Sequence, residues 1–192
     1  MNLFLTNSLI MLLLSCIESN AFNIFTKLPL GPYKLIFKHI GKCNDSSQNN
    51  KIQHHLYLSQ NPKSNVTEIK GYTNSSVPFD DTLFLEVTFS FKDADGSWKD
   101  NTLYHKSPKG CSSFKYLLGA SWTAIMEGLG IKNVTCPISP GIYTATGVDT
   151  SLLSNANLPK TFVYGTYKIQ QYYTLKREVY SCIILIVEFK PV

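Results

Sequence analysis

Alternating apolar and polar residues recur along the chain, with turn signals between the alternating segments. The clearest segment is residues 83–91, in which every second residue is apolar and the others include Glu86 and Ser90. A period of two places the two sets of side chains on opposite faces of a strand. Asp95-Gly96 follows and is a strong hairpin signal. Similar patterns predict further strands at residues 33–40, 55–58, 98–104, 161–173 and 179–190.

One segment has a helical period instead. Its apolar residues recur at spacings of three and four, which places them on one face of a helix. We expect Ser112 or Ser113 to cap the start of this helix, and Gly128 and Gly130 to end it. The apolar stripe either packs into the core or, in a hollow fold, lines the mouth of a cavity. Its residues are Phe114, Leu117, Leu118, Trp122, Ile125, Met126 and Leu129.

The fold class predicted from these patterns is all-β, a two-sheet sandwich with one short amphipathic helix. The chain has no internal repeat, no low-complexity tract and no linker long enough to divide it, so residues 22–192 are expected to form a single domain. Residues 182–189 are apolar at nearly every position. This pattern fits a strand between a core and a cavity, or one buried on both faces by protein.

The first residues of the chain have the features of a signal peptide. Residues 3–17 are apolar, and Ser19-Asn20-Ala21 supplies the small residues that signal peptidase accepts, so residues 1–21 are predicted to be removed. A retained membrane anchor is the alternative, but the apolar run is shorter than the ~20 residues that span a bilayer. The expected location is therefore extracellular, with the lysosomal lumen as the other possible destination.

Composition supports this location. Four of the five cysteines follow residue 21, and an even number is typical of an oxidising compartment. Four Asn-x-Ser/Thr sequons predict glycosylation in the secretory pathway, at Asn44, Asn65, Asn74 and Asn133. Removing residues 1–21 takes away Glu18 and raises the formal net charge from +5 to +6. The basic residues form no basic helix or RNA-binding motif, which argues against nucleic acid as a partner. The mild positive net charge instead favours approach to anionic membrane surfaces.

No catalytic or metal-binding pattern is evident. Residues 93–96 resemble the start of a calcium loop, but the later ligands are missing. His54 and His55 have no partners at zinc-ligand spacing and are expected to be exposed loop or strand residues. Ser121 lies in Gly-Ala-Ser-Trp-Thr, which is not the Gly-x-Ser-x-Gly motif of hydrolases. We therefore expect no enzyme activity, no metal and no cofactor.

The four remaining cysteines allow three disulfide pairings, and their spacing alone does not choose among them. Cys111 precedes the predicted helix and Cys136 follows it, so pairing these two would hold the helix and its connecting loop to the sheet. Cys43 and Cys182 would then join the first strand region to the last. In the chain-entropy model, the longer loop would add roughly 5 kcal/mol of stability and the shorter one about 3 kcal/mol.

Four motifs in the C-terminal part occur in a fixed order: Cys136-Pro137-x3-Gly141-x-Tyr143, Leu158-Pro159, Gly165-x-Tyr167-Lys168-Ile169 and Cys182-Ile183. This order resembles the ganglioside activator family and, more broadly, the lipid-recognition proteins of the ML type, with arthropod secreted relatives such as the chemosensory proteins of the B type. The resemblance implies a β-cup for lipid acyl chains and the pairings Cys43–Cys182 and Cys111–Cys136. The chain lacks four further cysteines of the activator, so ganglioside recognition and hexosaminidase contact are not carried over.

A β-cup is physically suited to lipid. Packed sheets usually lie about 10 Å apart with side chains filling the gap, and sheets that splay apart at one end leave a pocket. Each buried methylene contributes roughly 0.8 kcal/mol, so a sixteen-carbon chain contributes on the order of 12 kcal/mol before the cost of ordering it. The apolar residues expected to contact lipid come from the helix and from the segments around Pro159. They are Leu117, Trp122, Ile125, Met126, Leu129, Leu152, Leu153, Phe162, Val163 and Tyr164.

The sequence therefore predicts a secreted, non-enzymatic lipid-binding or lipid-transfer protein. It would hold a lipid or another hydrophobic small molecule and present it to a membrane surface, a receptor or a lipid-processing enzyme. The first alternative is a chemosensory or immune accessory protein whose ligand-bound form is recognised by a membrane receptor. A lipid hydrolase is the second. For Leu152 and Leu153, the alternative to a rim contact is an ordinary apolar anchor for their loop.

Overall fold

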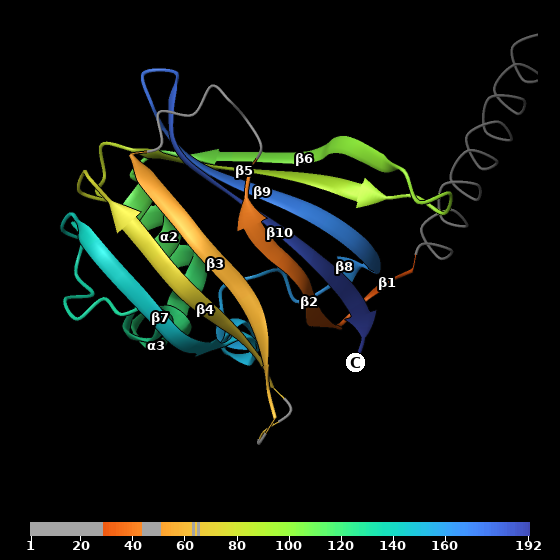
Figure 1. Cartoon of the computed structure of the whole chain (residues 1–192). Helices are drawn as coiled ribbons and strands as arrows, with labels where there is room; N and C mark the ends of the chain where they lie inside the picture. Colours follow the sequence, from red (N-terminus) through yellow and green to blue (C-terminus); the bar gives the residue numbers. More distant parts are fainter. Residues whose placement is uncertain (1–28, 44–50, 63, 65) are drawn as a thin grey trace, which may run out of the picture.

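The computed structural model describes residues 29–43, 51–62, 64 and 66–192 (Figure 1). Residues 1–21, predicted to be a signal peptide, and the sequons at Asn44 and Asn65 lie outside the described residues. Ten strands in three antiparallel sheets account for most of the described chain. The predicted all-β sandwich is therefore confirmed.

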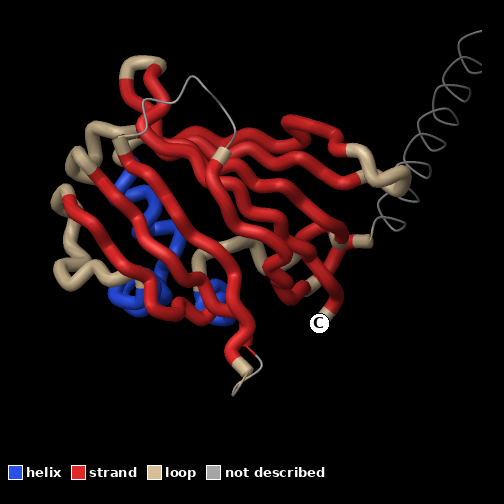
Figure 2. The backbone as a smooth tube through the Cα atoms, in the orientation of Figure 1, coloured by secondary structure: helices blue, strands red, loops and turns tan. Residues whose placement is uncertain are grey.

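The two larger sheets form the layers of an open sandwich (Figure 2). The five-stranded sheet has the order β2 (Tyr33–Lys42), β10 (Glu178–Pro191), β9 (Gly165–Leu175), β5 (Phe84–Lys92) and β6 (Trp98–Ser107). The three-stranded sheet has the order β3 (Ile52–Asn61), β4 (Val66–Ser75) and β7 (Gly141–Asp149). A short pair is formed by β1 (Leu30–Gly31) and β8 (Phe162–Val163).

The strands with regular alternation lie where the sequence predicts them. The segment at residues 83–91 is β5, and its antiparallel partner β6 follows the predicted hairpin turn, where Gly96 has a φ of +86°. Three strands are not predicted by the alternation: the two-residue β1 and the longer β4 and β7. The two longer ones each contain a glycine with positive φ, Gly71 and Gly147, close to a register shift between them. Glycine at such an irregularity interrupts the alternation by which strands are recognised.

The predicted continuous helix is wrong in one respect, because the structure breaks it into α2 (Gly110–Leu118), η1 (Gly119–Ser121) and α3 (Trp122–Gly128). Gly119 has a φ of +54°, a left-handed conformation that ends the first helical segment. Both α2 and α3 still carry the predicted apolar stripe. Figure 1 shows them behind the three-stranded sheet, on the side that faces the rest of the molecule.

The predicted capping of this helix is also wrong. The residue before α2 is Lys109, which has a φ of +58° and no side-chain cap. Asp81, from the loop before β5, accepts hydrogen bonds from the Ser112 backbone N–H at 2.8 Å and from the Ser112 hydroxyl at 2.6 Å. Ser113 instead donates its hydroxyl to the Pro108 carbonyl. A residue distant in sequence thus supplies the acceptor that the first turn needs.

Two disulfides join the cysteines in the predicted pairing. Cys43 and Cys182 link the end of β2 to its neighbour β10, with their Cα atoms 5.6 Å apart. Cys111 and Cys136 link the start of α2 to the loop before β7, with a Cα separation of 6.0 Å. Such bonds persist in oxidising compartments, which indicates that the protein is not cytosolic. In the part of the chain that the structure describes, no helix has the length and apolar character needed to cross a membrane.

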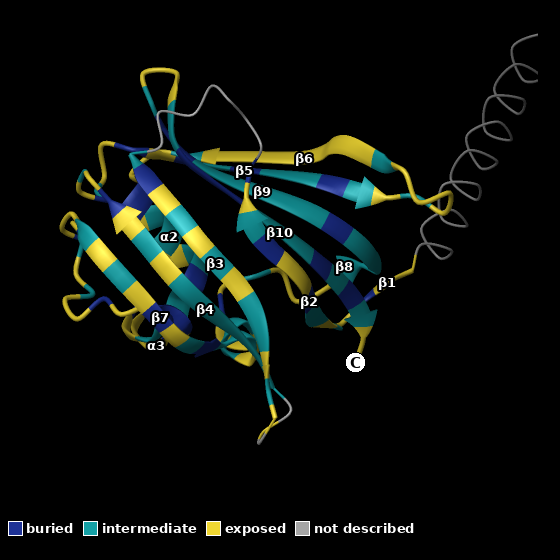
Figure 3. Cartoon of the chain, in the orientation of Figure 1, coloured by how far each residue is buried: buried dark blue, intermediate teal, exposed yellow. Residues whose placement is uncertain are grey.

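Buried apolar residues form two clusters between the layers. The larger packs α2 and α3 against β7 and the start of β5, and includes Leu83, Trp122, Met126 and Val148. The smaller contains Phe37, Tyr167, Val187 and Phe189, from the inner face of the five-stranded sheet. By contrast, β6 at the edge of that sheet is exposed over most of its length (Figure 3). One edge of the sandwich is therefore uncovered.

Candidate functional site

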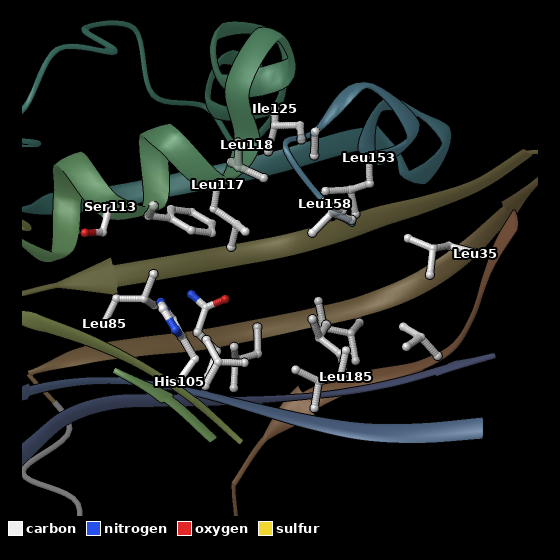
Figure 4. A pocket seen from close by; sticks show the side chains of 18 of the residues that line it. Leu35, Leu85, His105, Ser113, Leu117, Leu118, Ile125, Leu153, Leu158 and Leu185 are labelled. Carbon is white, nitrogen blue, oxygen red and sulfur yellow. The ribbon is translucent and has the colours of Figure 1, made fainter. Parts of the chain in front are cut away.

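A cavity of about 1120 Å³ lies between the two layers (Figure 4). Its volume is slightly above the ~300–1,000 Å³ usual for small-molecule sites. The inner face of the five-stranded sheet forms one wall. The three-stranded sheet, the helices and the 3₁₀ segment η2 (Thr150–Asn155) form the opposite wall.

The wall formed by the five-stranded sheet is almost wholly apolar because of strand register. Leu185 pairs with Ile40 on one side and with Ile169 on the other, and Ile169 pairs with Phe89. Residues directly opposite each other in neighbouring strands share a face of the sheet, so alternate positions of four strands point into the cavity. The apolar residues of this wall are Leu35, Phe37, Ile40, Leu85, Val87, Phe89, Ile169, Ile183, Leu185, Val187 and Phe189.

The opposite wall combines residues from the helices, η2 and the three-stranded sheet. Figure 4 shows Leu117, Leu118 and Ile125 from the helices, with Leu153 from η2, across the cavity from Leu185. Apolar residues that complete this wall are Leu56, Ile69, Phe114, Leu129, Val148, Ala156 and Leu158. The cavity is thus enclosed mainly by aliphatic and aromatic side chains, which favour an apolar ligand.

Half of the residues predicted to contact lipid line this cavity. They are Leu117, Ile125, Leu129, Leu153 and Phe162. The first three come from the helical stripe, so on this side the stripe faces a cavity as well as the core. Leu153 and Phe162 are half-buried and lie inside the cavity rather than on an exposed rim.

The other five lie outside the cavity lining, which corrects their predicted position. Trp122 is 3% exposed and donates its indole N–H to the Val134 carbonyl, and Met126 is also in the core. Leu152 packs against the same core. Val163 pairs with Leu30 in the β1–β8 pair, and the Tyr164 hydroxyl donates to the Pro32 carbonyl. The stripe is wider than the cavity wall, because part of it packs against the loop after α3.

The cavity opens at the edge of the five-stranded sheet. Leu103 in β6 is 50% exposed and Tyr116 in α2 is 76% exposed, and both line the cavity. Their neighbours Lys106, Lys109 and Lys115 are exposed basic residues. No local sequence pattern reveals this opening, because it depends on β6 being an edge strand that α2 leaves uncovered.

One polar residue of the cavity, His54, is not predicted from the sequence to lie there. Its ring Nδ1 lies 2.9 Å from the Thr73 hydroxyl, and both residues line the cavity. The prediction that both histidines are exposed is wrong for His54 and right for His55, which stacks on Tyr72 on the other face with the ring centroids 4.6 Å apart. The inward alternation of Ile52, His54 and Leu56 would have identified it.

Because His54 is buried in the cavity wall, we expect the stability of the fold to depend on pH. Burial, and to a lesser extent the nearby His55, lowers the pKa of His54 from 6.5 to about 4. The unfolded chain therefore takes up a proton below pH 6.5 that folded His54 rejects until about pH 4, so the folded state loses stability as the pH falls through this window. Between about pH 7 and about pH 5 the loss should approach about 2 kcal/mol.

Urea unfolding at several pH values measures this loss. His54→Leu should remove most of the pH dependence above about pH 5, where carboxyl groups remain ionised. His55→Leu is the matched control and should keep it. Equal slopes in the wild type and His54→Leu would show that His54 is not held neutral by burial.

The chain matches no protein-family model and no curated protein. The resemblance to the ganglioside activator family and the ML-type proteins therefore stays a prediction from the C-terminal motifs. The apolar cavity between the sheets is an independent feature of the molecule that bears on its function.

Proposed function

We propose that this chain is a secreted, non-enzymatic lipid-binding or lipid-transfer protein that holds acyl chains between its two sheets. The observation that carries the proposal is the large apolar cavity. Small proteins normally fill the space between packed sheets with side chains, and an unfilled apolar space forfeits packing contacts. A bound acyl chain would supply those contacts.

The energy available is sufficient for exchange with membranes. At roughly 0.8 kcal/mol per methylene, a sixteen-carbon chain supplies on the order of 12 kcal/mol before ordering costs. Two disulfides hold the walls on either side, because Cys43–Cys182 joins β2 to β10 and Cys111–Cys136 anchors α2. The stability that these disulfides add offsets the packing contacts that an empty cavity lacks.

The opening suits approach to an anionic membrane. Leu103 and Tyr116 are exposed apolar residues at the cavity mouth, and Lys109 and Lys115 lie beside them. Basic residues near an anionic surface each contribute about 1 kcal/mol of attraction. Secretion and glycosylation belong to the same proposal, and Asn74 and Asn133 are exposed as an acceptor site requires.

A transfer assay tests the function. The secreted protein is incubated with vesicles that contain a self-quenched fluorescent phospholipid, and the fluorescence released into a protein-sized fraction is measured. We expect transfer, and faster transfer from vesicles containing phosphatidylserine than from pure phosphatidylcholine vesicles because of the basic mouth. If neither the phospholipid nor a fluorescent monoacylglycerol enters the protein fraction, lipid transfer is the wrong function and the accessory-protein alternative becomes the better one.

A further inference from the structure

The polar side chains of the cavity are concentrated at one end. Gln171 in β9 pairs with Val87, which pairs with His105 in β6, so these three share one row of the inner face. On the opposite sheet, His54 and Thr73 form a pair near the start of β3. Figure 4 shows His105 and Ser113 at the same end as Leu85, whereas Leu35 lies at the far end.

Most polar groups at this end are already hydrogen-bonded within the protein. The hydroxyls of Ser112 and Ser113 donate to Asp81 and Pro108, and His105 pairs with Ser107 at 2.6 Å. A ligand would have to break these bonds to use the same atoms. They therefore form part of the wall and are poorly placed to recognise a head group.

Two lining residues from opposite sheets keep unused hydrogen-bonding capacity. His54 bonds Thr73 through Nδ1, and its Nε2 has no partner among the described residues. Gln171 donates Nε2 to the Tyr173 hydroxyl at 2.7 Å, while its Oε1 has no partner in the same part of the chain. Neither atom is fully buried, and both residues line the cavity. A polar atom in an apolar cavity requires a partner from water or from a ligand.

The charges around the cavity restrict that ligand. Lys109 is the one basic lining residue in the described chain apart from the histidines, and it is exposed at the mouth. Asp149 is the one acidic lining residue there, and its carboxylate accepts the Ser151 N–H at the start of η2. Burial lowers the pKa of His54 to about 4, so its ring is neutral near pH 7. An ionised head group beside His54 and Gln171 would be buried without a counter-charge, which is costly.

We propose that the cavity selects lipids with an uncharged, hydroxyl-bearing head group that hydrogen-bonds to His54 and Gln171, with the chain extending toward Leu35 and Phe189. This inference rests on the proposed lipid-binding function. A hydroxyl both donates and accepts, so it can donate its proton to the Gln171 Oε1, which only accepts, and accept from His54 in the tautomer that carries the proton on Nε2. Long-chain alcohols and monoacylglycerols have such head groups, whereas fatty acids are ionised at neutral pH.

Displacement of the fluorescent probe N-phenyl-1-naphthylamine tests this selectivity. Three competitors share a twelve-carbon chain and differ in the head group: 1-dodecanol, dodecanoate and dodecyl methyl ether. At neutral pH the wild-type protein should bind dodecanol about tenfold more tightly than either of the others. His54→Leu and Gln171→Leu should each weaken dodecanol binding about fivefold or more. Gln171→Leu should leave ether binding within about twofold, because an ether has no proton to donate to the Gln171 Oε1.

Neighbouring residues on the outer faces of the same strands are matched controls. His55→Leu in β3 and Gln170→Leu in β9 should keep the wild-type preference, because neither residue lines the cavity. Equal affinities for the three competitors, or tightest binding of dodecanoate, would overturn the head-group inference and leave lipid binding intact. Failure of the wild-type protein to bind the probe or any competitor would overturn lipid binding itself.

Discussion

Leu185→Asp is expected to reduce the affinity for long-chain lipids at least about 100-fold. Leu185 is half-buried in β10, and its side chain faces the cavity between Ile40 and Ile169 (Figure 4). Without ligand, water in the cavity can solvate the new carboxylate. A bound acyl chain would displace that water and bury the charge unpaired, at a cost of several kcal/mol, and each 1.4 kcal/mol or so is a factor of ten in affinity.

The control for this substitution is Ile184→Asp. Ile184 is the preceding residue of the same strand, and it points to the outer face of the sheet and does not line the cavity. Both variants should be secreted with two disulfides, and only Leu185→Asp should lose binding in a probe-displacement titration. Unchanged affinity in a folded Leu185→Asp variant would place the lipid somewhere other than this cavity.

Removing the Cys43–Cys182 disulfide is expected to have the largest effect on stability. Its cysteines are 139 residues apart in sequence, whereas Cys111 and Cys136 are separated by 25. In the chain-entropy model the longer loop stabilises the fold by roughly 5 kcal/mol and the shorter loop by about 3 kcal/mol. Because small domains have about 5–15 kcal/mol in total, the first loss alone approaches the whole stability of the fold.

Paired Cys→Ser variants measure this difference. The Cys43→Ser/Cys182→Ser variant should be retained by the cell or unfold at much lower urea than the wild type. The Cys111→Ser/Cys136→Ser variant should still be secreted, with a smaller loss. If loss of the Cys111–Cys136 disulfide destabilised the protein more than loss of the Cys43–Cys182 disulfide, local packing of α2 would outweigh the entropy of the unfolded chain.

The sequence predicts the elements whose pattern is local. The alternation in residues 83–91 is a direct consequence of one inward face. Leu85 and Val87 in β5 are buried, as is Leu83 just before the strand. The position of Cys111 and Cys136 on either side of the helical stripe leads to the observed pairing. These inferences succeed because periodicity and order along the chain carry the information.

The site is less predictable because it depends on register between distant strands. Leu35 and Phe189, for example, become neighbours on the cavity wall only when β2 pairs with β10. Trp122 is apolar and lies on the same helical stripe as the cavity residues. It is nevertheless buried in the core, where its indole N–H donates to the Val134 carbonyl. The histidine pair suggests an exposed polar segment, although the position of His54 in the alternation of β3 places its side chain inside.

Native mass spectrometry of the purified protein, followed by lipid analysis of its organic extract, distinguishes a lipid-filled cavity from an empty one. We expect a stoichiometric lipid with an uncharged hydroxyl-bearing head group on the wild-type protein, and no such lipid on Leu185→Asp. A wild-type protein that is free of lipid, and that also takes up neither a fluorescent monoacylglycerol nor a fluorescent fatty acid, would show that the cavity does not hold lipid.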